Sequence, residues 1–405
     1  MTSRPSNLGA ASYETESSWA EATDTWGTRL QVLGEPVVPS DIQQRIAEPF
    51  TQQYAHETKM GVRGPWQGQF TIELALTGHG GTTAGALTAT DLYTLLVNFF
   101  GNGSATQAGT TVDTSPTSAS QFALVGGTVV ERQLVRVGAL GDGRCEGQFG
   151  AVLTPATTTF LTAFPATPNA GDVVYATLGV YPDELPASMV APTSTRWLLQ
   201  TANGQWSAKG CYPVSASFSG LNVGEQPRVS LTYGVSRWAE ANETFPDATA
   251  TDAKAGSIVA AGSCFLQDSA TVTRQTLALR NWNLSIDMGV QPLMGPGGID
   301  AYQTIIGAVR TKCRASLDLT IDAEASGTNT LNDIYTGTAL QHCLMSLNVG
   351  DGTALGFYFK NCRPTNYVTQ ETGDGLNRRT LSLEAGSGPN TSDDNTLANW
   401  LLAMG

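Results

Sequence analysis

Two segments of the sequence alternate apolar and polar side chains, and this alternation restricts the fold more than any other feature. Residues 69–77 place apolar side chains at every second position, namely Phe70, Ile72, Leu74 and Leu76. Residues 314–322 repeat the pattern with Ala315, Leu317, Leu319 and Ile321. A period of two residues is typical of a β-strand that buries one face and exposes the other. The two segments therefore predict antiparallel sheets with one polar side.

Further strands are indicated by shorter apolar runs between turns, which draw on the 44 Gly and 19 Pro residues of the chain. We predict them at 29–33, 129–137, 149–153, 196–201, 211–218, 228–235, 277–288, 343–349, 354–362 and 379–384. Helices are predicted at 91–100, at 330–335 and in a C-terminal segment, 396–404. These patterns predict a mainly β fold.

The order of predicted elements occurs twice along the chain. Each half has a strand, a Gly- and Pro-containing step, a loop, a Val-Arg step, an alternating strand, a helix and closing strands. The landmarks are Gly34-Glu35-Pro36 and Val62-Arg63 in the first half, and Gly289-Val290-Gln291-Pro292 and Val309-Arg310 in the second. Alternation alone lets any two strands be aligned, so the repeat rests on the shared order of landmarks.

This repeat predicts a division of the chain into two β modules. An extended N-terminal arm occupies 1–27, a first module 28–236 with an insertion at about 101–196, a linker 237–262, and a second module 263–405. Long loops are expected at 34–61 and 289–307. Alignment of the two alternating strands matches Thr71 with Ser316 and Glu73 with Asp318.

The charge balance argues against a protein that grips nucleic acid by its phosphates. The chain has 22 Lys and Arg against 35 Asp and Glu, a net charge of −13. Such a protein needs a basic face, because counterion release supplies most of its affinity. No apolar run approaches the ~20 residues that span a bilayer, and residues 1–6 lack the apolar core of an export signal, so we expect neither a membrane protein nor a secreted one.

Signatures of catalysis and of cofactor binding are missing from the sequence. The three His residues, His56, His79 and His342, have no metal-ligand spacing, and no nucleophile elbow or phosphate-binding loop occurs. The six Cys residues contain no CxxC pair, and we expect most of them to be small core residues. We therefore predict no enzyme activity, no cofactor and no metal.

Three stretches resemble the tail tube, or major tail, proteins of long-tailed, siphovirus-type bacteriophages. They are Tyr13-Glu14-Thr15-Glu16-Ser17-Ser18-Trp19, Gly68-Gln69-Phe70-Thr71-Ile72-Glu73-Leu74, and Ala208-Lys209-Gly210-Cys211-Tyr212-Pro213-Val214-Ser215 with Gly224-Glu225-Gln226-Pro227-Arg228-Val229. The resemblance covers most of the chain and is weakest at 101–196. It implies β-sandwich or barrel modules, each with one short flanking helix.

The resemblance also implies a structural virion protein, assembled in the cytoplasm of the host bacterium. Its partner is itself, as stacked rings of three chains with pseudo-six-fold symmetry or of six chains. The stacked rings form a hollow tube through which the genome passes during DNA ejection. Tail terminator and tail tip proteins are further implied partners, DNA is met only transiently in the lumen, and no membrane is involved.

Candidate site residues follow from this expectation. The lumen-facing candidates are Thr71, Glu73, Thr77, Ser316, Asp318, Thr320 and Asp322. No base occurs among these positions, so we expect Glu73 and Asp318 to form rings of negative charge that repel phosphate. Candidates for contacts between rings or subunits are Tyr13, Trp19, Trp26, Pro36, Pro39 and Pro292. Ordinary outward positions of a half-buried sheet would give the same alternation.

Two other classes of protein share this composition. An exported adhesin or pilus-like β protein would have the same Thr-, Gly- and Ala-rich strands but needs an export signal. A β-rich glycan-cleaving enzyme would need two carboxylates about 5–9.5 Å apart, usually beside exposed aromatic rings. Assembly into rings or tubes would distinguish a tail tube protein from these alternatives.

Overall fold

The computed structural model describes the following parts of the chain. They are residues 10–20, 26–30, 32–37, 46–47, 62–63, 68–76, 91–105, 110–114, 118–119, 121–125, 134–138, 148–154, 159–160, 166–175, 177–182, 192–202, 204–246, 258–268, 274–277, 279–295, 304–311, 313–322, 330–349, 353–371, 377–385 and 400–405. The described residues are mainly β, and sixteen strands join in one hydrogen-bonded sheet. The predicted fold class is confirmed at this level.

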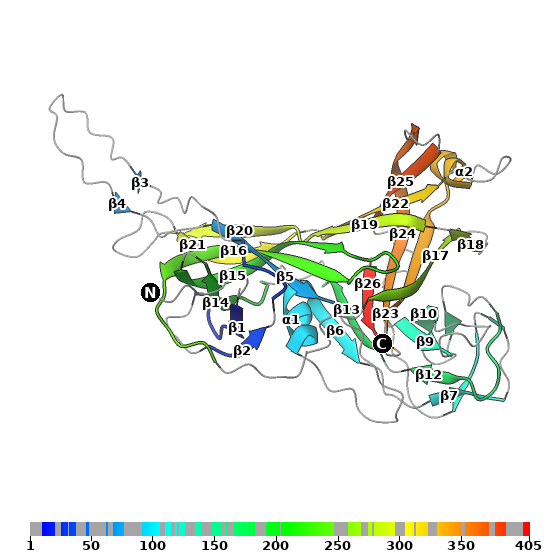
Figure 1. The fold of residues 1–405 in the computed structure, drawn as a ribbon, viewed down its shortest axis with the longest axis horizontal. Helices are drawn as coiled ribbons and strands as arrows, with labels where there is room; N and C mark the ends of the chain where they lie inside the picture. Colours follow the sequence, from blue (N-terminus) through cyan, green and yellow to red (C-terminus); the bar gives the residue numbers. More distant parts are fainter. Residues whose placement is uncertain are drawn as a thin grey trace.

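Seven antiparallel strands, each hydrogen-bonded to the next, form the central layer of the molecule (Figure 1). In order of pairing they are β5 (Gly68–Ala75), β16 (Arg228–Glu240), β15 (Gly204–Ser219), β19 (Leu279–Asp287), β22 (Arg314–Asp322), β25 (Asn377–Ala385) and β24 (Thr353–Glu371). The predicted alternation decides their orientation, because Phe70, Ile72, Leu317 and Leu319 are buried. The opposite side is polar, and we call it the polar face.

A second layer covers the apolar side of these strands, and the long strands β15 and β24 belong to both layers. The first part of β15 pairs with β14 (Thr195–Thr201), which is followed by β1 (Ala10–Thr15) and β2 (Thr28–Leu30). The first part of β24 pairs with β23 (Gln341–Val349), followed by β17 (Val259–Asp268) and β18 (Arg274–Leu277). Its other edge meets β26 (Trp400–Met404), then β13 (Leu178–Pro182) and β6 (Gly101–Ala105).

Aromatic side chains fill the space between the two layers. The rings of Phe70 and Trp197 lie 5.5 Å apart between β5 and β14. Phe357 of β24 lies 5.5 Å from Phe218 and 5.2 Å from Trp282. Such edge-to-face pairs add to the burial of large apolar surfaces.

Two helices within the described residues flank the strands. Helix α1 (Asp91–Phe100) has the predicted bounds, contacts β13, β6, β15 and β2, and buries Leu92, Leu95, Leu96, Phe99 and Phe100. Gly101 follows it with a φ of 120°, a conformation that glycine adopts readily, so the helix ends there. Helix α2 (Thr330–Thr336) lies against β24 and β25 through Leu331 and Ile334.

One pattern of strand pairing occurs twice. In the first half β1 pairs with β2 and β14, and the order continues β14-β15-β16-β5. In the second half β17 pairs with β18 and β23, and the order continues β23-β24-β25-β22. Helix α1 lies between β5 and β14 in sequence, and α2 lies between β22 and β23. The two halves therefore share element order and pairing.

The bends of the two long strands also match in sequence. Residues 209–213 read Lys-Gly-Cys-Tyr-Pro and residues 360–364 read Lys-Asn-Cys-Arg-Pro. Gly210 and Asn361 both have a positive φ, and the pairing of each strand with its neighbour in the second layer shifts register there. Such a bulge bends a strand, which carries it from one layer into the other.

The Val-Arg step also recurs in equivalent pairings. Ile46 of β3 (Ile46–Ala47) lies opposite Arg63 of β4 (Val62–Arg63), and Val290 of β20 (Val290–Gly295) lies opposite Arg310 of β21 (Thr304–Arg310). Arg63 precedes Thr71 by the same number of residues as Arg310 precedes Asp318.

The register predicted between the two alternating strands is wrong by two residues. Thr71 lies opposite Thr232 and Asp318 lies opposite Ser382, at the same distance from the two bends. Thr71 therefore corresponds to Asp318 rather than to Ser316, and Glu73 corresponds to Thr320 rather than to Asp318. Alternation cannot detect a shift of two residues between aligned strands, because such a shift leaves every side chain on the same face.

Four other predicted elements are corrected. Residues 10–15 of the predicted arm are the strand β1, which lies between β2 and β14. Within the predicted C-terminal helix at 396–404, the described residues 400–404 are the buried strand β26, because a short apolar run has no period that separates helix from strand. The predicted loop at 289–307 contains β20 and the start of β21, and the predicted linker contains the end of β16 and the start of β17.

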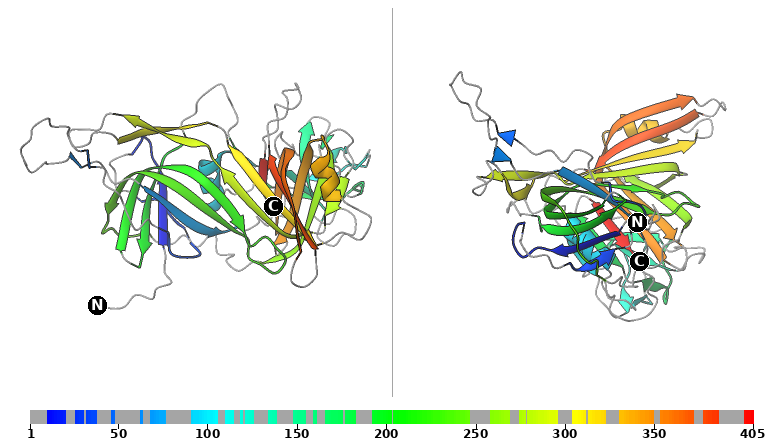
Figure 2. Two further views of the ribbon diagram at one scale, coloured as in Figure 1. Left: turned by 90° about the horizontal axis from the view of Figure 1, so that it is seen from above. Right: turned by 60° about the vertical axis from the view of Figure 1, so that its left-hand side comes forward.

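The insertion at 101–196 builds an additional sheet beside the second half. Its strands are β7 (Thr110–Val112), β8 (Leu124–Val125), β9 (Leu134–Val137), β10 (Gln148–Thr154), β11 (Thr159–Phe160) and β12 (Val173–Tyr175). A small core of Val112, Phe122, Val135, Val137 and Val174 holds them together. This sheet lies at one end of the molecule, away from β1 and β14 (Figures 1 and 2).

Candidate functional site

The polar face is a broad exposed surface shared by both halves of the chain. One row of residues opposite one another on neighbouring strands consists of Glu73, Ser230, Ser217, Ser285, Ser316, Glu384 and Arg363. Ser217, Ser285 and Ser316 are exposed. A row of short hydroxyl side chains gives this part of the sheet a surface without large protrusions and hydrated by water.

Charges of both signs lie on this face. Its described carboxylates are Glu73, Asp287, Asp318, Asp322 and Glu384, and its described arginines are Arg228, Arg280, Arg314, Arg363 and Arg378. Four of these arginines come from neighbouring strands and Arg314 comes from β22 itself, so the face is not uniformly acidic. Glu73 is paired with Arg228, and the expectation that Glu73 and Asp318 form rings of negative charge stays a prediction.

Ion pairs join several of these groups. Glu73 Oε1 lies 3.3 Å from a guanidinium nitrogen of Arg228. Asp322 Oδ1 lies 3.1 Å from Arg280 and 3.8 Å from Nε of Arg378. A guanidinium that faces a carboxylate attracts phosphate less than a free one.

All described lumen candidates lie on the polar face. The hydroxyls of Thr71 and Thr320 lie 3.0 Å from those of Thr232 and Thr380, their cross-strand neighbours. Ser316 and Asp322 are exposed, and Asp318 is half-buried. Thr77 lies outside the described residues.

The predicted contact residues have different positions. Tyr13 is buried, with its ring 5.3 Å from that of Trp197, and Pro36 is also buried, so neither is available to another subunit. The indole N–H of Trp26 donates to the carboxylate of Glu243. Among the remaining candidates, Pro292 is exposed, Trp19 contacts the hairpin β20–β21, and Pro39 lies outside the described residues.

The hairpin β20–β21 reaches from the second half over the first. Trp19 Nε1 and Ser236 Oγ both donate to the carbonyl of Ile305, at 3.0 and 2.9 Å. On its outer side Leu293, Met294 and Ile306 are 46, 41 and 52% exposed. One end of the hairpin is thus fixed, while its outer side presents apolar side chains to solvent.

Arg310 at the end of this hairpin contacts helix α1. Its guanidinium donates to the carbonyl of Phe99 at 2.8 Å and also to the carbonyl of Phe100. These are the last carbonyls of α1, which have no partner within the helix. A cation at this end also opposes the helix dipole, so Arg310 caps α1 across the two halves.

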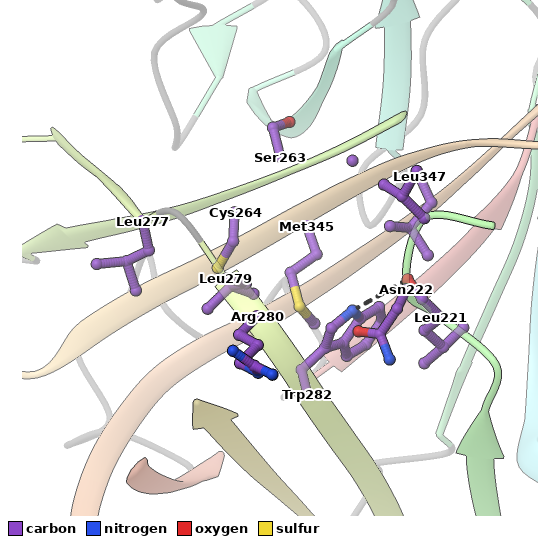
Figure 3. Close-up of a pocket in the computed structure, with 12 residues that line it drawn as sticks. Leu221, Asn222, Ser263, Cys264, Leu277, Leu279, Arg280, Trp282, Met345 and Leu347 are labelled. Atoms are coloured by element: carbon purple, nitrogen blue, oxygen red, sulfur yellow. Dashed lines mark hydrogen bonds between the residues drawn. The ribbon is translucent and has the colours of Figure 1, made fainter. Parts of the chain in front are cut away.

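A pocket of about 310 Å³ lies where the turn between β15 and β16 meets the second half (Figure 3). Its lining is mostly apolar and includes Leu221, Cys264 and Met345. The indole of Trp282 donates to the carbonyl of Leu221 at 3.3 Å. Among the described residues of the lining, Arg280 alone is charged, and it already pairs with Asp322. The pocket is therefore a packing seam between the halves and offers no acid–base pair.

Buried titratable groups elsewhere serve the fold. Glu16 accepts hydrogen bonds from the backbone of Gly210 and Ala20, and burial raises the pKa of its carboxyl above the ordinary value. Burial likewise raises the pKa of the Cys211 and Cys362 thiols, which keeps them protonated and unreactive. The expected core role of cysteines is confirmed for Cys211, Cys264, Cys343 and Cys362, which are all buried.

Two further observations concern the described residues. They contain no group of three or more His, Cys, Asp or Glu side chains arranged to hold a metal ion. None of their helices combines the length and the apolar character that a bilayer crossing requires.

Sequence reasoning missed the roles of Arg310 and of the two bends. A signal was present for the bends, because Lys-x-Cys-x-Pro occurs at 209–213 and at 360–364. No comparable signal shows that Arg310 reaches a helix end more than two hundred residues away. Comparison with protein-family models gives no match, and comparison with curated protein sequences gives none either.

Proposed function

We propose that this chain is the tail tube protein of a long-tailed bacteriophage, with two tube-type β modules in one polypeptide. The observation that carries the proposal is the polar face, which continues without interruption from β5 in the first half to β24 in the second. An exposed sheet that crosses from one repeated unit to the next is what the wall of a channel built from such units requires.

The chemistry of the polar face suits passage of a duplex. DNA carries one charge per ~1.7 Å of its axis, and proteins that hold it present arginines and lysines that are free to meet phosphate. Here Arg228, Arg280 and Arg378 lie beside carboxylates. We infer a wall that binds DNA weakly because its charges are balanced and many of its other side chains are uncharged hydroxyls.

The repeat sets the form of the ring. If the two halves occupy successive positions, three chains complete a ring of six similar units, and contacts between unlike surfaces close it. The apolar side of hairpin β20–β21 then meets the next ring, and end rings meet the tail terminator and tail tip proteins.

Electron microscopy of the purified chain tests this proposal. We expect rings or tubes of uniform width, with a hole lined by the polar face. Sedimentation velocity over a range of protein concentrations and temperatures gives the second measurement. A chain that stays a 42.6 kDa monomer under every condition, including the presence of tail tip components, would overturn the proposal.

A further inference from the structure

The contacts between the two halves of the chain include the following three. Residues 215–218 of β15 pair with residues 284–287 of β19. Leu221, in the turn that follows β15, is buried beside Trp282 (Figure 3). Arg310 of hairpin β20–β21 caps helix α1. Together these contacts define how one half is placed beside the next.

The second half carries the counterparts of the surfaces that the first half uses in this junction. Residues 366–369 of β24 correspond to 215–218 of β15, counted from the two bends. Among the described strands, residues 366–369 pair only with β25, so their other edge is unpaired. Val368 on this edge is 37% exposed, and the end of α2 at Tyr335 and Thr336 is exposed as well.

The first half carries the counterpart of the capping arginine. Arg63 lies opposite Ile46 in β3–β4, as Arg310 lies opposite Val290 in β20–β21. Helix α1 is capped by Arg310 of the same chain. The first half and the second half thus hold matching pieces of a second junction. Strands β3 and β4 lie at the opposite end of the molecule from α2 (Figure 1), so one copy does not complete this junction with itself.

We propose that Arg63 of one copy caps the C-terminal end of α2 in a second copy, as Arg310 caps α1 within the chain, and that the edge of β24 at 366–369 lies in the same interface. This inference rests on the proposed function, because it specifies the contact that closes the ring. The chain contains one internal example of the interface by which it assembles.

The physical reasons are the same in both junctions. The last carbonyls of a helix lack intrahelical partners and carry about half a negative charge, which an arginine satisfies with several donors at once. An exposed edge strand is a site for pairing with another chain, and natural proteins protect such edges. A second copy bound at this interface would contact both the C-terminal end of α2 and the unpaired edge of β24.

Charge reversal separates the two junctions. Arg63→Glu leaves the internal junction intact, so we expect an unchanged melting temperature. The protein concentration needed for assembly should rise by about tenfold or more. Arg310→Glu disturbs the internal junction, so we expect a lower melting temperature of the monomer. Arg237→Glu, which reverses an exposed arginine of β16 outside both junctions, is the matched control and should assemble as the unmodified chain does.

Mixing two defective variants gives the decisive result. Val368→Lys blocks the β24 side and Arg63→Glu blocks the opposite side of the interface. Each variant alone should remain monomeric, whereas an equimolar mixture has one intact junction per pair and should sediment as a heterodimer without rings. If the unmodified chain assembles and Arg63→Glu assembles equally well, this inference is wrong while the proposed function stands. If the unmodified chain never assembles, the proposed function itself fails.

Discussion

Gly210 and Asn361 hold the same left-handed backbone conformation, with φ of 60° and 49°, at the corresponding bends of β15 and β24. Glycine and asparagine are the residues that adopt this region most readily. A Cβ added at Gly210 would lie 2.8 Å from Cβ of Ser236 and 3.1 Å from Cβ of Ala20. The first bend is therefore too crowded for a side chain.

Gly210→Ala should destabilise the chain by about 2–4 kcal/mol, from the left-handed conformation and the crowding together. Gly224→Ala is the matched control, because Gly224 also has a positive φ of 88° but nothing lies within 4 Å of an added Cβ. Urea unfolding of both variants measures the difference. Equal losses would show that crowding at the bend contributes nothing.

Removal of carboxylates from the polar face should create DNA binding. In a Glu73→Gln, Asp322→Asn double variant the guanidiniums of Arg228, Arg280 and Arg378 lose their partners. We expect salt-sensitive binding of a short duplex by fluorescence anisotropy, with a log–log slope of about −0.9 for each phosphate contacted.

The control for this experiment removes the same charge elsewhere. Glu240 and Asp333 are exposed and lie away from the polar face, so Glu240→Gln with Asp333→Asn should leave DNA binding unchanged. Equal binding by both double variants would show that net charge, rather than the polar face, governs the interaction.

Glu16 should make stability depend on pH in the direction opposite to most carboxylates. Burial raises the pKa of Glu16 in the folded state above its ordinary value of 4.5, so the folded chain binds its proton more tightly than the unfolded chain does. The contribution of this group to stability is then lost as pH rises from the unfolded pKa through the folded one.

Glu16→Gln should remove this dependence. We expect the free energy of unfolding of the variant, relative to the unmodified chain, to rise as the pH increases above the ordinary carboxyl pKa of 4.5. Urea midpoints at several pH values provide the measurement. Parallel pH profiles would mean that Glu16 titrates alike in both states.

The seam between the halves depends on Leu221. Its side chain is 2% exposed, so Leu221→Ala should cost about 2–5 kcal/mol. Val223, two residues along the same turn, is 66% exposed, and Val223→Ala should change stability by no more than about 0.5 kcal/mol. A Leu221→Ala variant as stable as Val223→Ala would contradict the assigned packing.

The outer side of hairpin β20–β21 should act in assembly rather than in folding. Leu293→Ser with Ile306→Ser replaces two exposed apolar side chains, so we expect the melting temperature to stay the same. On the proposed function, rings should still form but stack into shorter tubes in electron micrographs. Tubes of unchanged length would remove the hairpin from the stacking contact.

Sequence patterns predicted the elements that local chemistry determines. Helix α1 has the predicted bounds because apolar residues recur at helical spacing and Gly101 ends it. The buried and polar faces of β5 and β22 were predicted, because alternation within a strand shows which side chains share a face, whatever its register with neighbouring strands. The run at 264–266 within β17 went unrecognised because polar and small residues surround it.

The register between strands and the contacts between distant residues could not be predicted from local sequence patterns. The serine row of the polar face depends on how seven strands align, and a shift of two residues is invisible to alternation. The same ambiguity led to the wrong match of Glu73 with Asp318. The ion pairs of Arg228 and Arg280 depend on strands that are neighbours in space but distant in sequence.

Strands β15 and β24 run through both layers without a break, and this continuity has a mechanical consequence. A force that pulls the layers apart acts along covalent backbone rather than across a packed interface. The hydrogen bonds of the flanking strands are then loaded in shear, so many must break at once. Such a chain would resist stretching and bending much more strongly than a sandwich whose layers meet only through side chains.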